Sequence, residues 1–477
     1  MSSFFRREIR MRRRLVIVGA GFALLLAGCS SLTPGSSAST SSTPSTSSAA
    51  VSATTSTGGA VASSGAVGSG SGVAAVTTAV PADKVELKLA FTDSPDMTKA
   101  LIAAFEKKFP QVTITSQYTQ FNDYVKSLKL AMSSDSAPDL AQYNAAFGTF
   151  VAGGLIRDLT PYEQAYGWDK SFPKSALDEL RVDPTGKILG TGALIAVPGG
   201  LSLVGVYYNK QLMTKAGITS PPTTLTEMEA DLAKAKTAGI TPVSVGSLDT
   251  GGLHVWASVM NVSTDVPALK NWINGKAGSS IVTPAAIAAT QKFADWAKKG
   301  YFPASANGTS ENDSATAFAK GASLFLINGN WAAAQLDKAM GANVGFMVMP
   351  PATAGGKAVG NGFSVSYSIS AKSKHPEAAA AFLNFLQSPE ASVIEDAGGF
   401  LPPNASAAPA ATGVKGDLKK ANQAVVSADG LIPFPDFAAP AMLDSLESGL
   451  QSVIAGREQP QDFLQSLQTV WTAYHGS

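Results

Sequence analysis

The residues that carry most enzyme and metal chemistry are few and widely spaced in this chain. It has three histidines, none of them in an H-x-x-x-H pair: His254, His375 and His475. Its single cysteine, Cys29, excludes an intramolecular disulfide and a cysteine-cluster metal site. The stretch GLSLVG is one residue longer than a G-x-S-x-G nucleophile elbow and precedes a predicted strand, not a helix. We therefore expect no cofactor, no metal and no catalytic residue, although two acids that meet in the fold leave glycoside hydrolysis open.

Length and charge narrow the class of protein further. A chain of 477 residues is too long for one core and predicts two or more domains. The formal net charge is +1, but the first 28 residues carry six arginines and one glutamate, so the remainder is weakly acidic. A weakly acidic body has no electrostatic basis for binding phosphate backbones, so we expect no nucleic-acid partner.

Residues 1–28 have the layout of a secretory signal peptide. A basic region, Arg6–Arg14, precedes an apolar stretch, Leu15–Leu26, that is shorter than the roughly 20 residues of a membrane span. The ending Leu-Ala-Gly-Cys resembles the lipobox of bacterial lipoproteins, which implies cleavage before Cys29 and acylation of its thiol. Acyl chains would then hold the protein on the cell membrane. An uncleaved anchor helix is the alternative, and we expect the general secretory route over twin-arginine export.

Residues 29–83 predict the lipid anchor followed by a flexible tether. After the cysteine the segment consists almost entirely of Ser, Thr, Ala, Gly, Val and Pro, without periodicity or aromatic residues. Such a composition cannot bury enough apolar surface to offset the entropy of ordering. The sequence therefore predicts a folded, extracytoplasmic body that begins near Asp83.

The body opens with alternating strands and helices. Alternating or continuous apolar residues predict strands in KVELKLAF, VTITSQY and APDLAQYN, and helical spacing predicts helices in MTKALIAAFEKKFP and NDYVKSLKLAMSS between them. Later strands are expected in LVGVYYN, ASLFLING and VGFMVMP, and later helices in TLTEMEADLAKAKTAG and HPEAAAAFLNFLQS. The opening β-α-β-α-β order predicts an α/β fold with parallel strands covered by helices.

Five stretches in order resemble one family. They are APDLAQYNAAFGTFVAGGLIRDLTPY, AVPGGLSLVGVYYNKQLMTKAGITSPPTTLTEM, FAKGASLFLINGNW, GFMVMPP and GNGFSVSYSISAKSKHPEAAAAFLNFLQSPEA. Together, over residues 84–477, they resemble the extracytoplasmic solute-binding proteins of ABC importers, in particular the carbohydrate-binding group that includes maltose-binding protein. The resemblance implies a receptor that captures a sugar or oligosaccharide and delivers it to permease subunits, and we expect it to be a monomer.

The resemblance also implies a type II periplasmic-binding-protein fold, with two lobes joined by a hinge of crossing strands. Each lobe is a sheet flanked by helices. The expected N-terminal lobe comprises residues 84–196 and 350–397, and the C-terminal lobe residues 197–349 and 398–477. We expect the crossings near Ala196–Gly199 and Phe346–Pro350. Lobes that meet beyond the carboxyl ends of their strands form a cleft for a ligand.

Candidate ligand-binding residues follow predicted strands. Aromatic rings would cover the C–H faces of a sugar, and Asp, Asn, His and Trp N–H groups would take its hydroxyls. Trp331 matches the family's stacking tryptophan, and Tyr143 matches a second stacking position. The full expected set is Asp93, Ser94, Tyr143, Asn144, Asp249, His254, Trp256, Trp331, Asn361, Phe363 and Asp436.

One departure from the family keeps alternatives open. The segment PGGLSL after the first crossing has no acid where some members have one, which puts a close copy of a maltodextrin site in doubt. The first alternative is a receptor of the same fold for a polyol, a polyamine or another metabolite. The second is a surface glycosidase or an accessory protein of a sensor.

Overall fold

Two separate β-sheets organise the part of the chain that this computed structural model describes, which is residues 76–143, 148–172, 174–402 and 410–476. The described residues all belong to one compact unit. The signal peptide, Cys29 and most of the expected tether lie outside the described residues. No helix within these ranges is long and apolar enough to cross a bilayer.

The first sheet has five strands in the order β2-β1-β3-β12-β6. These are β2 (Val112–Tyr118), β1 (Val85–Phe91), β3 (Leu140–Tyr143), β12 (Ser364–Ile369) and β6 (Val197–Leu201). β1 runs parallel to β2 and β3, whereas β12 runs antiparallel to β3 and β6. Alternate residues of β1 are buried, as the pattern of KVELKLAF predicts.

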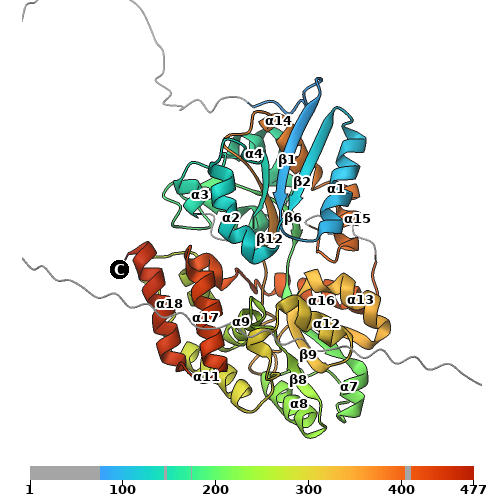
Figure 1. The fold of residues 1–477 in the computed structure, drawn as a ribbon, viewed down its shortest axis with the longest axis vertical. Helices are drawn as coiled ribbons and strands as arrows, with labels where there is room; N and C mark the ends of the chain where they lie inside the picture. The colour runs from blue at the N-terminus through green and yellow to red at the C-terminus, as the bar shows by residue number, and fades with distance from the viewer. Residues whose placement is uncertain (1–75, 144–147, 173, 403–409, 477) are drawn as a thin grey trace, which may run out of the picture. The chain divides into compact units, whose positions relative to one another are not determined.

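Helices cover the first sheet, and together they form the first lobe (Figure 1). The longer ones are α1 (Pro95–Lys108), α2 (Phe121–Ser133), α14 (Pro376–Phe385) and α15 (Pro389–Ala397). Phe105 of α1 meets Phe382 of α14 edge to face, with ring centroids 5.3 Å apart. Short elements complete this lobe: α3 (Gly148–Ala152), α4 (Thr160–Tyr166), α5 (Trp168–Ser171), α6 (Lys174–Asp178), β4 (Arg181–Val182) and β5 (Ala193–Leu194).

The second sheet has four strands in the order β10-β7-β9-β8. These are β10 (Val344–Met347), β7 (Val204–Asn209), β9 (Ser323–Gly329) and β8 (Thr241–Ser244), and β8 and β9 run parallel. Every residue of β9 is buried, as expected for the apolar run ASLFLING. A short pair, β11 (Gly360–Asn361) and β13 (Leu431–Ile432), lies beside this sheet.

The helices around the second sheet form the second lobe (Figure 1). α8 (Leu225–Thr237) begins with a capping box that Thr224 and Glu227 form. The other α-helices are α7 (Lys210–Lys215), α9 (Gly251–Ser263), α10 (Val266–Ile273), α11 (Pro284–Lys298), α12 (Glu311–Ala319), α13 (Ala333–Met340), α16 (Gly413–Ser427), α17 (Met442–Ile454) and α18 (Pro460–His475). Short 3₁₀ turns include η1 (Ala306–Gly308), η2 (Asn330–Ala332), η3 (Gly341–Asn343) and η5 (Pro435–Ala438).

Three segments connect the lobes, and hydrogen bonds join them to one another. The first links β6 to β7 through Ser202, the second links β11 to β12 through Phe363, and the third returns through Leu401. The Ser202 Oγ donates to the Phe363 carbonyl at 2.7 Å, and the Leu201 amide donates to the Leu401 carbonyl at 2.7 Å. The sheets thus place the crossings later than the expected Ala196–Gly199 and Phe346–Pro350. Val197–Leu201 still pairs within the first sheet, and Val344–Met347 pairs within the second.

The start of the folded body differs from expectation. The folded body begins before Asp83, because Val76 and Val80 pack against the core and the Thr78 carbonyl accepts a hydrogen bond from Tyr166 at 3.3 Å.

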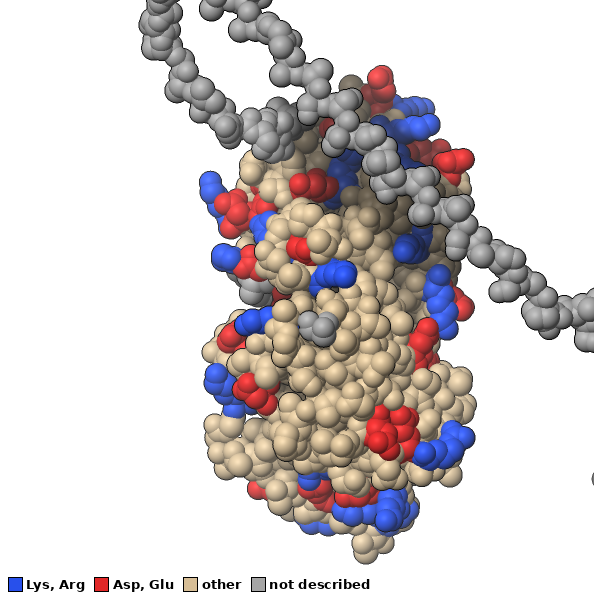
Figure 2. Space-filling view, turned by 90° about the vertical axis from the view of Figure 1, so that its left-hand side faces the viewer, with Lys and Arg blue, Asp and Glu red and all other residues tan. Residues whose placement is uncertain are grey.

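The charged surface is mixed: Figure 2 shows acidic and basic side chains interspersed on the face that it displays, with uncharged areas between them. That face therefore has no basic stripe of the kind that binds nucleic acid.

Glu395 of α15 predicts an unusual pH dependence of stability. Its side chain is fully buried, and neither carboxylate oxygen has a hydrogen-bond partner among the described residues. Burial raises the pKa of Glu395 well above its ordinary value, so the folded state binds a proton that the unfolded chain releases at lower pH. This group therefore lowers the free energy of unfolding as the pH rises above the unfolded-state pKa.

Glu395→Gln removes that penalty. We expect the variant to gain stability over the natural chain at pH 8 and to differ little from it near pH 4, in urea unfolding followed by circular dichroism. Glu390→Gln, at an exposed position of the same helix, is the matched control. An equal effect of Glu395→Gln at both pH values would contradict this account.

Candidate functional site

A cavity of about 300 Å³ lies between the two lobes. The first lobe contributes Thr92–Pro95, which follow β1, and residues from Tyr118 to Asn122, which follow β2. The second lobe contributes residues from Asp249 to His254 and Trp331, which follow β8 and β9. Both walls are therefore built beyond the carboxyl ends of parallel strands, where open α/β sheets bind ligands.

Aromatic rings form much of the second lobe's side of the cavity. Trp331 lies in η2, and Phe434 and Phe437 lie at η5. The Trp331 and Phe434 ring centroids are 6.4 Å apart, and those of Phe434 and Phe437 are 5.9 Å apart. Phe363, from a connecting segment, meets Phe437 edge to face at 4.7 Å. These rings offer an apolar surface of the kind that covers flat C–H faces.

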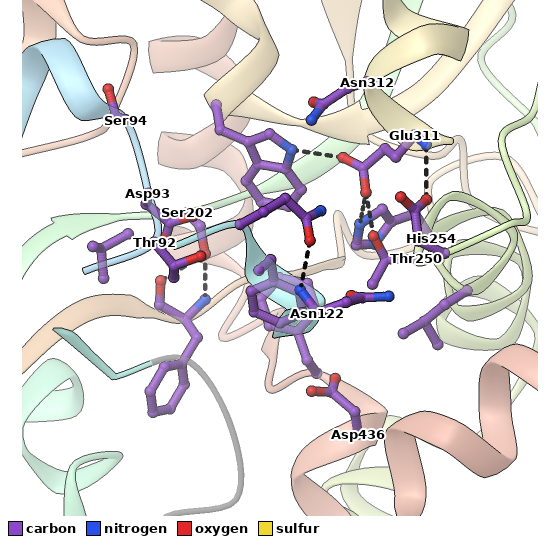
Figure 3. A pocket seen from close by; sticks show the side chains of 18 of the residues that line it. Thr92, Asp93, Ser94, Asn122, Ser202, Thr250, His254, Glu311, Asn312 and Asp436 are labelled. Carbon is purple, nitrogen blue, oxygen red and sulfur yellow. Dashed lines mark hydrogen bonds and ion pairs between the residues drawn. The ribbon is translucent and has the colours of Figure 1, made fainter. Parts of the chain in front are cut away.

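Glu311, the first residue of α12, holds the polar side of this wall together. Its carboxylate accepts a hydrogen bond from Trp331 Nε1 at 2.8 Å, pairs with His254 Nε2 at 3.2 Å and accepts the Thr250 hydroxyl. Its main-chain amide donates to Asp249 at 2.7 Å. Figure 3 shows His254 and Thr250 converging on Glu311. The indole of Trp331 is thus fixed in orientation by a side chain from another helix.

Electrostatics favour a charged Glu311. Burial opposes its ionisation, but the charge of His254 and hydrogen bonds from His254, Thr250 and Trp331 outweigh burial and lower its pKa to about 2. Asp249 behaves differently, because burial raises its pKa although the hydrogen bond from the main-chain amide of Glu311 acts to lower it. Glu311 is therefore an anion at neutral pH, and it serves chiefly to position its neighbours.

A buried glutamine positions the first lobe's wall. Gln142 Oε1 accepts the main-chain amides of Thr92 and Asp93, both at 2.8 Å, and its Nε2 donates to Tyr367 at 3.3 Å. Ser94 follows in the left-handed region, with φ of 41°, and is the N-cap residue of α1. The loop after β1 is therefore held open toward the cavity by a residue of the neighbouring strand β3.

Two acids from the C-terminal part of the chain lie at or near the cavity. Asp436 lines the cavity, and burial raises its pKa to about 7 although His254 opposes the shift. Burial also raises the pKa of Glu447 of α17 to about 7, although a hydrogen bond from Asn122 at 3.2 Å acts to lower it. Among the described residues, no group of three or more His, Cys, Asp or Glu side chains is arranged to hold a metal ion.

The structure gathers most of the expected binding residues in this one cavity. It is lined by Asp93, Ser94, Asp249, His254, Trp331, Phe363 and Asp436. Asn144 and the side chain of Tyr143 lie outside the described residues. The cavity lining does not include the two other expected residues, Trp256 and Asn361.

Trp256 and Asn361 have structural partners. Trp256 is fully buried in α9 and donates through Nε1 to Thr290 at 3.0 Å. It stands two residues after His254, and residues two apart in a helix lie on different faces. Asn361 is buried and donates to the Pro433 carbonyl at 3.0 Å, which braces the chain just before η5. Both side chains therefore lie in the protein interior and support the cavity wall.

Sequence reasoning missed three important residues: Glu311, Asn122 and Phe434 all line the cavity. An acid in the first turn of a helix is ordinary, so the type and position of Glu311 carry no signal by themselves. Phe434 was within reach, because it stands two residues before Asp436 in PFPDF, and aromatic residues beside a candidate acid favour a binding loop.

Comparison with known proteins agrees with this architecture. A binding protein of Brucella abortus is 23% identical over 410 residues, which cover 83% of this chain and 94% of that protein. The multiple sugar-binding protein of Streptococcus mutans is 24% identical over 322 residues, or 64% of this chain and 71% of that protein. The solved structure of a chitin oligosaccharide binding protein, at 22% identity, has a TM-score of 0.71 over 83% of this chain and 100% of that chain. The expected two-lobe α/β fold is thereby confirmed.

The family is established by a match to the sequence itself. The family model of bacterial extracellular solute-binding proteins matches residues 91–393, which is more than half of the chain. The matched segment includes strands of both sheets and the residues of both cavity walls except Phe400 and those near η5. The chain belongs to the family of bacterial extracellular solute-binding proteins.

Proposed function

We propose that this protein captures a sugar or oligosaccharide in the cavity between its lobes and delivers it to the permease of an ABC importer. The arrangement of Trp331, Phe434 and Phe437 beside Asp249, His254 and Asp436 is the observation that carries the proposal. A sugar ring needs an apolar surface for its C–H face and polar groups around its edge. The names of the Streptococcus and chitin-oligosaccharide relatives support the same ligand class.

Capture proceeds by closure of the lobes. The solute binds first to one wall, and rotation about the three connecting segments brings the other wall onto it. Closure is favoured only by the contacts that the second wall adds, because a ligand shifts an equilibrium by its differential affinity. The two sheets with their helices act as the moving bodies, and the permease subunits recognise the closed form. The protein acts as a monomer and leaves the bound solute chemically unchanged.

The location follows from the first residues of the chain. Acylated Cys29 anchors the protein to the cell membrane, and the Ser/Thr/Ala/Gly-rich segment lets the body reach away from the lipid. Radiolabelled palmitate incorporation into the natural chain, and its loss in Cys29→Ser, would support this part of the proposal.

Thermal unfolding against a panel of mono-, di- and oligosaccharides tests the ligand class. A ligand at a hundredfold excess over its dissociation constant adds about 2.7 kcal/mol to the free energy of unfolding, which is a measurable shift in Tm. We expect at least one saccharide to raise the Tm and to be recovered intact by chromatography. A panel without any shift would contradict sugar capture, and recovery of cleaved glycosides would contradict a receptor that leaves its ligand unchanged.

A further inference from the structure

The cavity lining has an unbalanced charge. Its lining residues include four acids, Asp93, Asp249, Glu311 and Asp436, and one group that can carry positive charge, His254. No lysine or arginine belongs to the lining as the structure describes it. A fifth acid, Glu447, lies directly behind Asn122, which does line the cavity. A neutral sugar can use these carboxylates as hydrogen-bond acceptors, but it does not neutralise their charge.

Two of these acids have structural roles. Asp249 and Glu311 stand at the beginning of α9 and α12, where the partial positive charge of a helix N-terminus stabilises carboxylates. Glu311 also has three side-chain partners, including its pairing with His254 at 3.2 Å. Neither acid therefore requires a charged ligand to explain its presence.

Asp436 has no comparable partner. It belongs to a four-residue 3₁₀ turn, its side chain is about 95% buried, and within the described ranges its one hydrogen bond is with its own main-chain amide. The side chain of His254, which lies near it, is already paired with Glu311, and Glu447 adds a second acidic group nearby. A buried carboxylate that faces a cavity without a cation of its own is costly unless a ligand supplies one.

The rings around Asp436 suit a cation as well as a sugar face. Phe434 and Phe437 flank it in sequence, and Phe434 lies 6.4 Å from Trp331 between ring centroids. The faces of Trp and Phe rings attract ammonium groups within about 6 Å. Figure 3 shows Asp436 entering the site from the opposite side to Asn312. The turn that carries Asp436 thus also brings two aromatic rings to the cavity lining.

We propose that the natural ligand is an amine-bearing saccharide, an amino sugar or an oligosaccharide that contains one, and that Asp436 binds its protonated amine beside Trp331 and Phe434. This inference rests on the proposed function and narrows its ligand class. It also gives the buried carboxylate of Asp436 a cationic partner, which a neutral saccharide does not supply.

Saccharides that differ at the amine, which is charged in one and acetylated and neutral in the other, test the inference. Isothermal titration calorimetry at pH 7 compares glucosamine, galactosamine and glucosamine oligomers with their N-acetylated counterparts, which have the same ring but no charge. We expect the best amine to bind at least about tenfold more tightly than its acetylated counterpart, the effect of one hydrogen bond to a charged group. Spermidine, an amine without a sugar ring, is expected to bind more weakly than that amino sugar.

Two variants localise the effect. Asp436→Asn is expected to abolish the preference for the amine over the acetylated saccharide, and cooperative urea unfolding of the variant shows that it is folded. Asp444→Asn removes one negative charge from α17 at a site where the side chain is 71% exposed, and it should leave the preference unchanged. The comparison thereby separates a local contact from the general negative charge of the lobe.

The outcomes separate this inference from the proposed function. Neutral saccharides that bind as tightly as their amines, with no effect of Asp436→Asn on the difference, would overturn the amine inference and leave sugar capture intact. An amine preference that survives Asp436→Asn would also overturn the assignment. Binding of spermidine without binding of any saccharide, or no binding at all, would overturn both.

Discussion

Trp331→Ala should weaken saccharide binding by about thirtyfold or more, because a tryptophan at the centre of a binding site commonly contributes about 2 kcal/mol or more. Of the chain's six tryptophans, five are buried in the core, and Trp331 is the partly exposed one that lines the cavity. Its Nε1 hydrogen bond to Glu311 holds the ring in place before a ligand arrives. The measurement is the Kd by isothermal titration calorimetry with the tightest saccharide of the panel.

Trp331→Phe separates the ring from its hydrogen bond. Phenylalanine keeps an aromatic face but cannot donate to Glu311, so we expect a loss of affinity smaller than that of Trp331→Ala. Both variants should unfold within a few degrees of the natural chain, since the side chain is not fully buried. Unchanged affinity in Trp331→Ala would contradict the assignment of this wall as the sugar platform.

Asn330→Ala should produce the largest loss of stability. Asn330 is fully buried beside the connecting segments, where its Oδ1 accepts the Leu203 amide at 2.9 Å and its Nδ2 donates to the carbonyls of Leu201 and Gly399, both at 3.0 Å. Alanine leaves these buried main-chain groups short of partners, and each such group costs about 1–3 kcal/mol. We expect the free energy of unfolding to fall by about 3 kcal/mol or more.

Urea unfolding measures this loss, and Asn343→Ala, at an exposed position, is the matched control. Because two of the three connecting segments converge on Asn330, its loss should also change ligand affinity by altering the balance between open and closed lobes. A loss below about 1 kcal/mol would mean that the connecting segments hold together without this side chain.

Much of the fold was predictable because local patterns and tertiary structure agree. The alternation in β1, the buried run in β9 and the capping box at Thr224 and Glu227 each specify one element from a few residues. The crossings were misplaced because a buried apolar strand such as Val197–Leu201 suits either sheet. Its pairing depends on β12, which is far away in sequence.

The candidate site was predictable only in part, for a related reason. Asp93, Asp249 and Trp331 were found because residues that follow strands tend to meet at one edge of a sheet. Trp256 was expected in the cleft because it stands next to such a loop, but α9 has already begun there and turns the ring into the core. The bonds that make Glu311 central come from two other segments, the start of α9 and η2, and spacing along the chain does not encode them.

A crystal structure of the protein with the tightest saccharide from the panel tests the central claim most directly. We predict that the saccharide occupies the cavity between the lobes, with one ring against Trp331 and polar contacts from both walls. A saccharide bound elsewhere, with Trp331 and Asp436 left uncontacted, would contradict this account of the site.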